Sequence, residues 1–413
     1  MTSPSLRILP AEPAAAYGGA DGDVGLARVR PASAKPCIVA LACVVLAGCG
    51  WYQAGYDPGR SGDNTTETHL GATNVAGIGE AWHADGIKFS TQPIVTGGLV
   101  LAWTDHCALP NCVYGIQALA PDSGAVRWTL PPDDLAVDWS LASDGTRFFV
   151  LRRLPGSFSS WVIDARSVAD GSLLWTSDSV GQPKGALTVA DGEVFAVGKL
   201  AAYAFDATTG KNLWAVITTQ VAWQAVTVNG DTAFVGDGSN LIAVDAHSGH
   251  QRWITSDDFQ FFYAMTKGSR VYASLRDDST ANAYDVATGR RLWQTTTPRT
   301  ADPWMPLADT TGLYAPSDGT GTVTARDPAT GALRWTWDQA GNLSISRVGQ
   351  PAEANGVLYV AADTTRGPEL FAVDAATGKT LHTITYTGSF IGSPVIWNGT
   401  VFIVVDETLH AYR

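Results

Sequence analysis

The chain has 413 residues, of which 45% are hydrophobic and 10% aromatic, so it is long enough to bury a large core. It carries 27 basic and 39 acidic side chains, which gives a formal net charge of −12. This acidic balance excludes nucleic acid as an expected partner, and it excludes attachment to anionic lipid by charge alone.

The first 48 residues have the pattern of an export signal. Three basic residues between positions 28 and 35 precede an apolar run over 37–46, which is too short to span a bilayer. The run ends in Leu46-Ala47-Gly48-Cys49, which resembles the lipobox of bacterial lipoproteins. We therefore predict that residues 1–48 are removed and that Cys49 is acylated with palmitate or a similar chain.

Removal of residues 1–48 leaves 23 basic and 36 acidic side chains, a net charge of −13. Attachment to the membrane must then come from the acyl chains, and stable anchoring needs more than one of them. Residues 49–70 are predicted to form the lipidated N-terminus and a tether, because 50–68 are rich in Gly, Asp and Thr. The expected location is the cell membrane, lipid-anchored, on the extracytoplasmic side.

From residue 71 onward the chain is repetitive. Seven copies of a phrase place an Ala six residues before a turn Gly, usually with an Asp between them, and the clearest copy is Ala204–Trp214. The copies recur at intervals of 39 to 47 residues. A fixed phrase at this period predicts a repeat architecture.

Each repeat also contains a second phrase, a small or polar residue and Gly followed by β-branched and aromatic residues. Examples are Asp191-Gly192 and Asn355-Gly356, each leading into an apolar run. Asx-Gly pairs favour tight hairpins, and the Thr-Gly or Ser-Gly turns before the Trp add another. Four short strands in about 40 residues are typical of one propeller blade.

The Gly-led strand occurs eight times, but only seven Ala-to-Trp phrases follow. The eighth blade stops at Ala411, and its missing outer strand is predicted at the other end, where 75–82 ends in Trp82. We therefore predict an all-β fold, one eight-bladed β-propeller over 71–413 with four-stranded antiparallel blades, closed by an N-terminal strand. Seven blades is the alternative if an insertion distorts the unit at 93–128.

Tryptophans of the repeat are predicted to be structural. A large ring on each outer strand can pack between neighbouring sheets, and its N–H can reach a carbonyl of the next blade. His382 stands where the seventh phrase should end, which predicts a looser contact between the last blades. The expected docking residues are Trp82, Trp128, Trp175, Trp214, Trp253, Trp293 and Trp335.

The mature chain keeps two cysteines, Cys107 and Cys112, in a loop insertion of the first blade. An even pair in an exported protein predicts a disulfide. The competing interpretation is a metal site, but only His106 is nearby and it does not complete a tetrahedral set. No metal site is expected.

One cluster of residues lies where the innermost strands should begin, at one mouth of the central channel. Exposed aromatic residues with an Arg are typical of protein-binding hot spots, and such rings also stack on sugars. The alternative is that they fill the channel and pack on each other. This possible partner platform comprises Trp139, Trp223, Phe262, Trp304 and Arg347.

The Ala-x-Asp-x-x-x-Gly-x-x-x-Trp phrase resembles the tryptophan-docking repeat of the quinoprotein-like, or PQQ-like, propellers. The stretch 51–62 also resembles the lead-in of exported members of that family. The resemblance implies one of two branches. Quinoprotein dehydrogenases hold pyrroloquinoline quinone and calcium in the centre of the ring, whereas BamB-like lipoproteins are non-enzymatic eight-bladed scaffolds that bind a partner protein.

The sequence favours the BamB-like branch. It has no adjacent cysteines, no evident calcium ligands, and no catalytic constellation of the Ser-His-Asp, phosphate-loop or HExxH kinds. We expect a monomeric, envelope-anchored scaffold without a cofactor, whose partner is another envelope protein or a cell-wall glycan. The alternatives are a PQQ-dependent dehydrogenase of alcohols or sugars and a glycan-binding propeller.

Overall fold

The computed structural model describes residues 50–87, 92–108, 111–131, 137–154, 160–183, 185–218, 225–237, 240–256, 261–275, 280–296, 306–317, 321–338 and 345–413. The side chains of a few strand residues within these ranges are also left undescribed, namely those of 105–108, 111–113, 137–140, 256, 261–263, 274–275 and 345–347. The predicted signal region and Cys49 lie outside the described residues.

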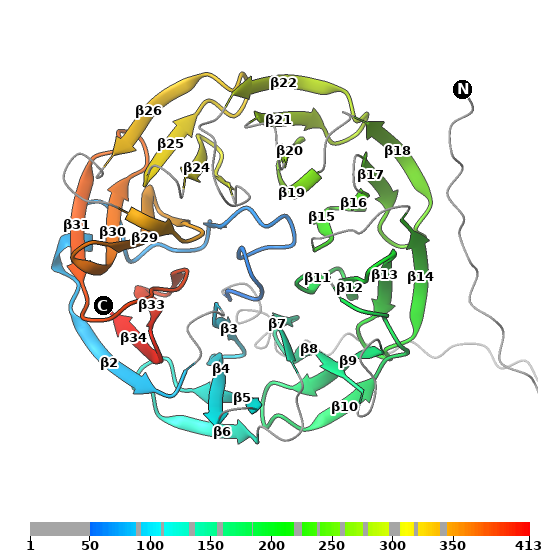
Figure 1. Cartoon of the computed structure of the whole chain (residues 1–413), viewed down its shortest axis with the longest axis horizontal. Helices are drawn as coiled ribbons and strands as arrows, with labels where there is room; N and C mark the ends of the chain where they lie inside the picture. Colours follow the sequence, from blue (N-terminus) through cyan, green and yellow to red (C-terminus); the bar gives the residue numbers. More distant parts are fainter. Residues whose placement is uncertain are drawn as a thin grey trace, which may run out of the picture.

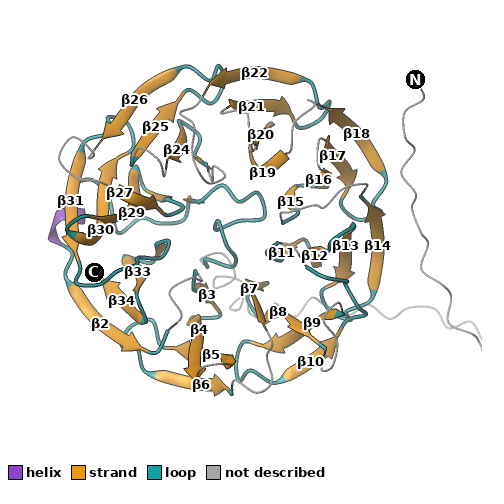
Figure 2. Cartoon of the chain, in the orientation of Figure 1, coloured by secondary structure: helices purple, strands orange, loops and turns teal. Residues whose placement is uncertain are grey.

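Eight sheets stand around a central axis and form a ring (Figure 1). In seven of the sheets the chain runs from the axis outward, so that an innermost strand A is followed by B, C and an outermost strand D, and in the eighth the outermost strand comes from the N-terminal end. The predicted eight-bladed, all-β propeller is confirmed. Figure 2 shows that the single short helix of the described part, η1 (Val75–Gly77), lies at the rim beside strand β31.

The first four blades follow the same plan. Blade 1 contains β3 (Ile94–Thr96), β4 (Leu99–Ala108), β5 (Asn111–Leu119) and β6 (Val126–Leu130). Blade 2 contains β7 (Val137–Ser143), β8 (Arg147–Arg153), β9 (Trp161–Ser167) and β10 (Leu173–Thr176). Blade 3 contains β11 (Thr188–Ala190), β12 (Glu193–Val197), β13 (Ala201–Asp206) and β14 (Asn212–Ile217). Blade 4 contains β15 (Thr227–Asn229), β16 (Thr232–Asp237), β17 (Asn240–Asp245) and β18 (Gln251–Ser256).

The last four blades include two departures from the plan. Blade 5 contains β19 (Phe261–Lys267), β20 (Arg270–Leu275), β21 (Thr280–Asp285) and β22 (Arg291–Thr296). Blade 6 contains β23 (Leu307–Ala308), β24 (Leu313–Ser317), β25 (Thr322–Arg326) and β26 (Leu333–Asp338). Blade 7 contains β28 (Ala352–Ala354), β29 (Val357–Thr364), β30 (Gly367–Asp374) and β31 (Thr380–Thr385), joined by β1 (Asp63–Asn64) and β27 (Ile345–Val348). Blade 8 contains β32 (Val395–Trp397), β33 (Thr400–Val405), β34 (Thr408–Tyr412) and the N-terminal β2 (Glu80–Asp85).

Burial follows from the position of a strand in its blade. Middle strands are covered by neighbouring blades on both faces, and every residue of β12 and β33 is buried. Outermost strands are covered on one face, so β2 alternates between exposed and half-buried residues. This difference explains why the B and C strands are continuous apolar runs while the D strands mix polar residues with Trp.

The ring closes as predicted. Strand β2 pairs antiparallel with β34, and Trp82 is the register partner of Ala411. Glu80 stands opposite Tyr412, so the N-terminal strand completes the sheet made by the C-terminal three. Among the described residues, no helix has the length and apolar character needed to cross a membrane.

Among the described residues, six of the seven predicted tryptophan docks form the expected hydrogen bond, and Trp335 packs against Gly378 without one. Six of the indole Nε1 atoms donate to a carbonyl oxygen in the next blade, and the partners and distances are Trp82 to Pro121 (3.1 Å), Trp128 to Val168 (3.0 Å), Trp175 to Ala207 (3.1 Å), Trp214 to Ala246 (2.6 Å), Trp253 to Val286 (2.9 Å) and Trp293 to Pro328 (3.1 Å). Each bond ties one outermost strand to the C–D turn of its neighbour.

The turn glycines take part in the same contacts. Gly210 has a φ of +71°, and a Cβ atom placed on it would lie 2.5 Å from the ring of Trp175. Gly378 stands in the same relation to Trp335, with a distance of 2.7 Å. At each of these two docks a single Gly is therefore needed for two reasons. It allows the left-handed backbone, and it leaves room for the close approach of the indole.

The junction between blades 7 and 8 is built differently. His382 lies on β31 opposite Ala372, and η1 contacts β31 beside it. Val75 of η1 is fully buried in a core cluster that spans blades 7, 8 and 1. The looser contact expected from His382 is therefore wrong for the described residues, because the segment before β2 fills the junction.

Candidate functional site at the mouths of the central channel

The two faces of the ring carry different connections. One face bears the A–B and C–D turns, such as Asp191-Gly192 and 207–211, and we call it the strap face. The other bears the B–C and D–A connections, such as 198–200 and 386–394, and we call it the loop face. The channel has one mouth on each face.

The chain's own N-terminal segment fills the mouth on the strap face. Residues 50–64, which we call the strap, lie inside the ring (Figure 1). Trp51, Gln53 and Ser61 of the strap are each at most 1% exposed. The expectation that 49–70 form a solvated tether is therefore wrong for 50–64, which are packed into the propeller.

Every blade holds the strap with at least one hydrogen bond. The bonds run from Val95 N to Trp51 O, Ser143 N to Tyr52 O, Val189 N to Gln53 Oε1, Val228 N to Pro58 O, Thr266 N to Gly59 O, Ala308 N to Ser61 O, Glu353 N to Gly62 O, and Asn64 Nδ2 to Ile396 O. An innermost strand has no neighbour on its channel side, and the strap supplies partners to N–H groups that would otherwise face the axis unpaired.

The strap enters and leaves through the same mouth. Its bridges from Trp51 to Val95 and from Gln53 to Ala142 are antiparallel, and innermost strands run toward the strap face. The chain therefore moves inward from Trp51 to Gln53. It returns through β1, which runs parallel to β28 toward the same face. Further along the chain, the carbonyl oxygen of Leu70 accepts a hydrogen bond from Nδ2 of Asn355, which lies in the A–B turn of blade 7.

Arg60 joins the bend of the strap to blade 3 by hydrogen bonds. Its Nη2 donates to Leu187 O at 3.3 Å and to Thr188 Oγ1 at 3.1 Å, and the side chain is buried. Its φ of +56° is in the left-handed region, where a residue other than Gly costs about 1–2 kcal/mol. The guanidinium bonds and the packing of the ring offset this strain.

Asp57 caps the same bend. Its carboxylate accepts hydrogen bonds from Ser61 N at 2.9 Å and from Ser61 Oγ at 2.6 Å. Burial nevertheless raises the pKa of Asp57, because the loss of hydration outweighs the two bonds that favour the charged form. The carboxylate therefore makes hydrogen bonds within the strap.

A buried carboxyl pair joins the strap to blade 7. Asp63 and Glu353 are register partners in β1 and β28, and each is 4% exposed. Lys267 Nζ lies 2.8 Å from Asp63 Oδ2, which keeps Asp63 paired. Burial and the neighbouring Asp63 raise the pKa of Glu353 to about 9, so Glu353 keeps its proton at neutral pH.

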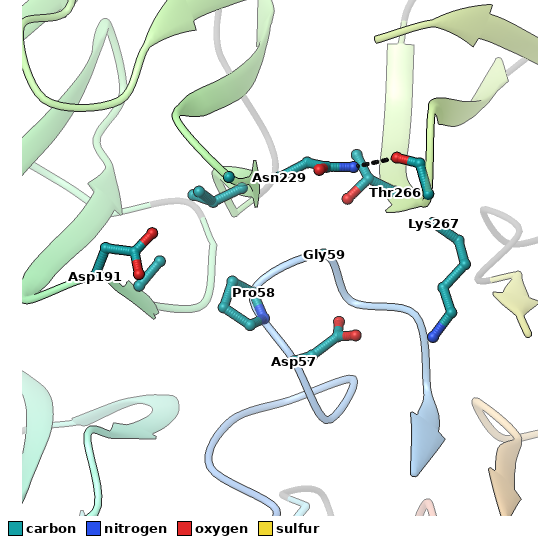
Figure 3. A pocket seen from close by; sticks show the side chains of 11 residues that line it. Asp57, Pro58, Gly59, Asp191, Asn229, Thr266 and Lys267 are labelled. Atoms are coloured by element: carbon teal, nitrogen blue, oxygen red, sulfur yellow. Dashed lines mark hydrogen bonds between the residues drawn. The ribbon is translucent and has the colours of Figure 1, made fainter. Parts of the chain in front are cut away.

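A pocket of about 290 Å³ opens on the strap face beside the strap. Figure 3 shows Pro58 and Gly59 between Asp191 on one side and Lys267 on the other. A hydrogen bond from Asn229 Nδ2 to Gly268 O, 2.8 Å long, joins the A–B turns of blades 4 and 5 at its rim. Its lining mixes polar residues such as Asp191 with apolar ones such as Ala190 and Val228, and no group of three metal-ligating side chains occurs among the described residues.

Three residues of the predicted platform belong to strand segments toward the opposite mouth. Trp139 is in β7, Phe262 in β19 and Arg347 in β27, and the pairing of each strand shifts register at or next to that residue. Strand β27 pairs with β29 beyond the end of β28, so it is the loop-face half of an interrupted innermost strand. The side chains of these three residues, and Trp223 and Trp304 altogether, lie outside the described residues, so their role stays a prediction.

The predicted disulfide is compatible with the backbone. Cys107 and Cys112 are register partners in the hairpin of β4 and β5. Opposed antiparallel residues have Cα atoms about 4.5–5.5 Å apart, within the roughly 4.4–6.8 Å that a disulfide spans. Their side chains lie outside the described part, so the bond itself stays a prediction.

Sequence reasoning missed the strap. The signal was present, because Trp51, Tyr52 and Tyr56 are unusual in a solvated tether. Trp51 packs edge-on against Tyr56 with the ring centroids 5.2 Å apart. Three aromatic residues in a short Gly-rich stretch indicate a segment with a partner surface rather than a free linker.

The ring of blades joined by indole-to-carbonyl docks defines the class, an eight-bladed β-propeller of the tryptophan-docking type. A protein family described as outer membrane protein assembly factor BamB matches residues 115–221, 199–336 and 319–413. These overlapping segments cover well over half of the chain, and the chain belongs to this family. The resemblance inferred from the repeat is thereby confirmed.

Individual relatives are distant. Tetrathionate hydrolase of Acidithiobacillus ferrooxidans is 25% identical over 267 residues, covering 49% of this chain and 53% of that protein. The chain thus spans about half the length of this curated relative.

Solved structures share the fold. A quinohemoprotein alcohol dehydrogenase of Pseudomonas putida HK5 superposes with a TM-score of 0.70 at 14% identity, over 89% of this chain and 80% of that one. BamB of Moraxella catarrhalis superposes with a TM-score of 0.57 at 13% identity, over 82% and 98%. These likenesses establish the architecture and nothing about chemistry.

Proposed function

We propose that this protein is an extracytoplasmic lipoprotein whose propeller is a non-enzymatic scaffold for another protein of the cell envelope. The observation that carries the proposal is the strap, which dedicates one mouth of the channel to internal hydrogen bonds and leaves the loop face as the surface for partners. Membership of the BamB family supports a protein partner. The lipobox-like Leu46–Cys49 supports the anchor.

The described residues around the strap do not fit a calcium–quinone pair. Calcium takes six to eight oxygen ligands from carboxylates, carbonyls and water, and carboxylates supply the negative charge. Here Asp63 is paired with Lys267, and Glu353 holds a proton. Asp57 is occupied by Ser61. No carboxylate in this group is free to serve as a metal ligand, which weighs against the dehydrogenase branch at this mouth.

The anchor is tested by labelling intact cells with a palmitate analogue. We expect label on the wild-type protein and none on Cys49→Ala, which should be released from the membrane. Label that persists on Cys49→Ala, or its absence from the wild type, would exclude lipidation at this residue.

The scaffold role is tested by crosslinking in intact cells followed by purification of the protein. We expect the triple change of Trp139, Trp223 and Trp304 to Ala to reduce capture of the partner by about tenfold or more, since hot-spot aromatics contribute at least about 1.4 kcal/mol each. The matched control is Leu174→Ala, an exposed residue on β10 at the outer rim. An unchanged crosslink in the triple variant would contradict the platform, and capture of glycan alone would favour a glycan-binding propeller.

The enzymatic alternative has its own test. The purified protein mixed with pyrroloquinoline quinone and calcium should show no change in absorbance and no dye reduction with alcohols or aldoses. Reduction of the dye would replace the scaffold proposal by the dehydrogenase one. Turnover of tetrathionate by the same preparation would instead replace the scaffold proposal by the activity named for the distant hydrolase relative.

A further inference from the structure

The strap fixes the place where the N-terminus leaves the ring. Val95 N donates to Trp51 O at 2.9 Å, and Ser143 N donates to Tyr52 O at 2.8 Å. Both contacts lie next to A–B turns, and the antiparallel bridges direct the chain before Trp51 toward the strap face. Gly50, which is buried, lies at this mouth.

No linker separates the predicted lipidation site, Cys49, from the strap. Cys49 is joined to Gly50 by one peptide bond, and consecutive Cα atoms are about 3.8 Å apart. An acyl group on Cys49 therefore begins within a few ångströms of a residue that the blades hold in place. A lipoprotein with a long linker could rotate freely at the membrane, whereas an acyl group on Cys49 would be joined to the ring without such a linker.

We infer that the ring lies with its strap face against the bilayer and presents its loop face to the partner. The inference rests on the proposed lipidation of Cys49 and adds an orientation to it. The surface in contact with lipid headgroups is then the ring of A–B and C–D turns. The pocket beside Pro58 and Gly59 also faces the membrane, so it is open to small solutes and headgroups but shielded from a large protein.

The turns and connections of the two faces differ in their exposed apolar side chains. Among the described residues, the A–B and C–D turns carry no exposed large hydrophobic side chain, although Val126, Leu173 and Leu333 are exposed at the first residue of the strands that follow C–D turns. The connections of the loop face carry two, Leu200 at 53% and Phe390 at 48% exposure. A polar turn surface suits contact with headgroups without insertion, whereas exposed apolar groups suit a protein interface.

The test places a fluorophore on either face of the full acylated protein in liposomes. Ser269 lies in the A–B turn of blade 5 and Ser389 in a connection of the loop face, and both are exposed. The innermost strand of seven residues separates the two faces by about 20 Å at roughly 3.3 Å per residue. Ser269→Cys and Ser389→Cys are a matched pair, labelled without reductant so that Cys107 and Cys112 stay as they are. The quencher is a nitroxide on the phospholipid headgroup.

We expect quenching at Ser269→Cys to be several times that at Ser389→Cys. Insertion of 20 Gly and Ser residues between Cys49 and Gly50, with a reach of about 25 Å, should reduce the difference to little or nothing. Equal or reversed quenching in protein that mass spectrometry shows to be acylated overturns the orientation alone. Absence of the acyl group from Cys49 overturns the lipid anchor and the orientation with it.

Discussion

Two regions hold the blades of this propeller together, the tryptophan docks at the rim and the strap at the axis. A dock is one contact repeated around the ring, and each copy joins only two adjacent blades. The strap is a single copy of an irregular segment, and it touches all eight blades.

The difference separates local from global stabilisation. Loss of one dock weakens one junction and leaves the others intact, as expected for a structure built from nearest-neighbour contacts. Loss of a strap contact affects the axis, where all the blades meet. Because the docks are repeated, the loss of one leaves the others at the rim. The strap at the axis has no second copy.

The comparison is tested most strongly by Trp51→Ala. Trp51 is 1% exposed and packs against Tyr56, and truncation of a buried large aromatic costs about 3–5 kcal/mol. We expect the free energy of unfolding, measured by denaturant titration, to fall by that amount. The exposed control Leu174→Ala should change it by less than about 0.5 kcal/mol. Equal effects of the two changes would mean that the strap contributes nothing to stability.

A smaller effect is expected at a dock glycine. Gly210→Ala forces a side chain onto a left-handed backbone and against the ring of Trp175, at a cost of about 2–4 kcal/mol. Gly192 has a φ of +80° with no atom within 4 Å of an added Cβ. Gly192→Ala should therefore show only the backbone cost of about 1–2 kcal/mol. Thermal melts of the pair measure the contribution of the indole contact, and indistinguishable melts would argue against it.

A still smaller loss is expected when a dock keeps its ring but loses its hydrogen bond. Trp214 Nε1 donates to Ala246 O at 2.6 Å, and Phe at this position leaves the carbonyl without that donor. We expect Trp214→Phe to lower the free energy of unfolding by about 1–3 kcal/mol, because the buried carbonyl loses its donor and Phe fills less space than the indole, with an unchanged fold by circular dichroism. A loss as large as that of Trp51→Ala would contradict the idea that docks are redundant.

The last change concerns the link between the strap and blade 7, and its effect depends on pH. The pKa of Glu353 is raised from 4.5 to about 9, so the stability it contributes is present in full below pH 4.5 and is lost as the pH rises toward 9. Glu353→Gln cannot ionise. Its melting temperature should equal that of the wild type at pH 4 and exceed it by a margin that grows as the pH rises from 4.5 to 8.

The control for this prediction is Glu407→Gln, an exposed residue on the loop face. It should leave the wild-type pH profile of the melting temperature unchanged. A difference between Glu353→Gln and the wild type that does not grow with pH would show that the carboxyl pair does not share a proton in the folded protein.

The rim could be predicted from the sequence because its signals are local and repeated. The turn Gly and the Trp four residues later reveal both the blade count and the docks, and Trp82 without a partner phrase reveals the closure by β2. The second role of the Gly, its approach to the indole of the neighbouring blade, joins residues some 35 positions apart. Sequence spacing alone does not show that contact.

The packing of the strap at the axis could not be predicted in the same way. The bonds of the strap are mostly made by backbone groups of residues such as Gly59 and Gly62, and these carry no side-chain signal. Its shape depends on eight blades that follow it in the chain. The raised pKa of Glu353 has the same origin, because Asp63 lies 290 residues earlier in the sequence and the pairing exists only in the closed ring.

The strap also sets the order in which the molecule can be assembled. Trp51 precedes every blade in the chain, but Asn64 needs Ile396 and β2 needs β34 before either is in place. Contacts of such large sequence separation form late, since the entropy of closing the loop must be paid first. The segment that comes first in the chain is therefore the last to be secured, and it stays without these partners until the C-terminal blades have formed.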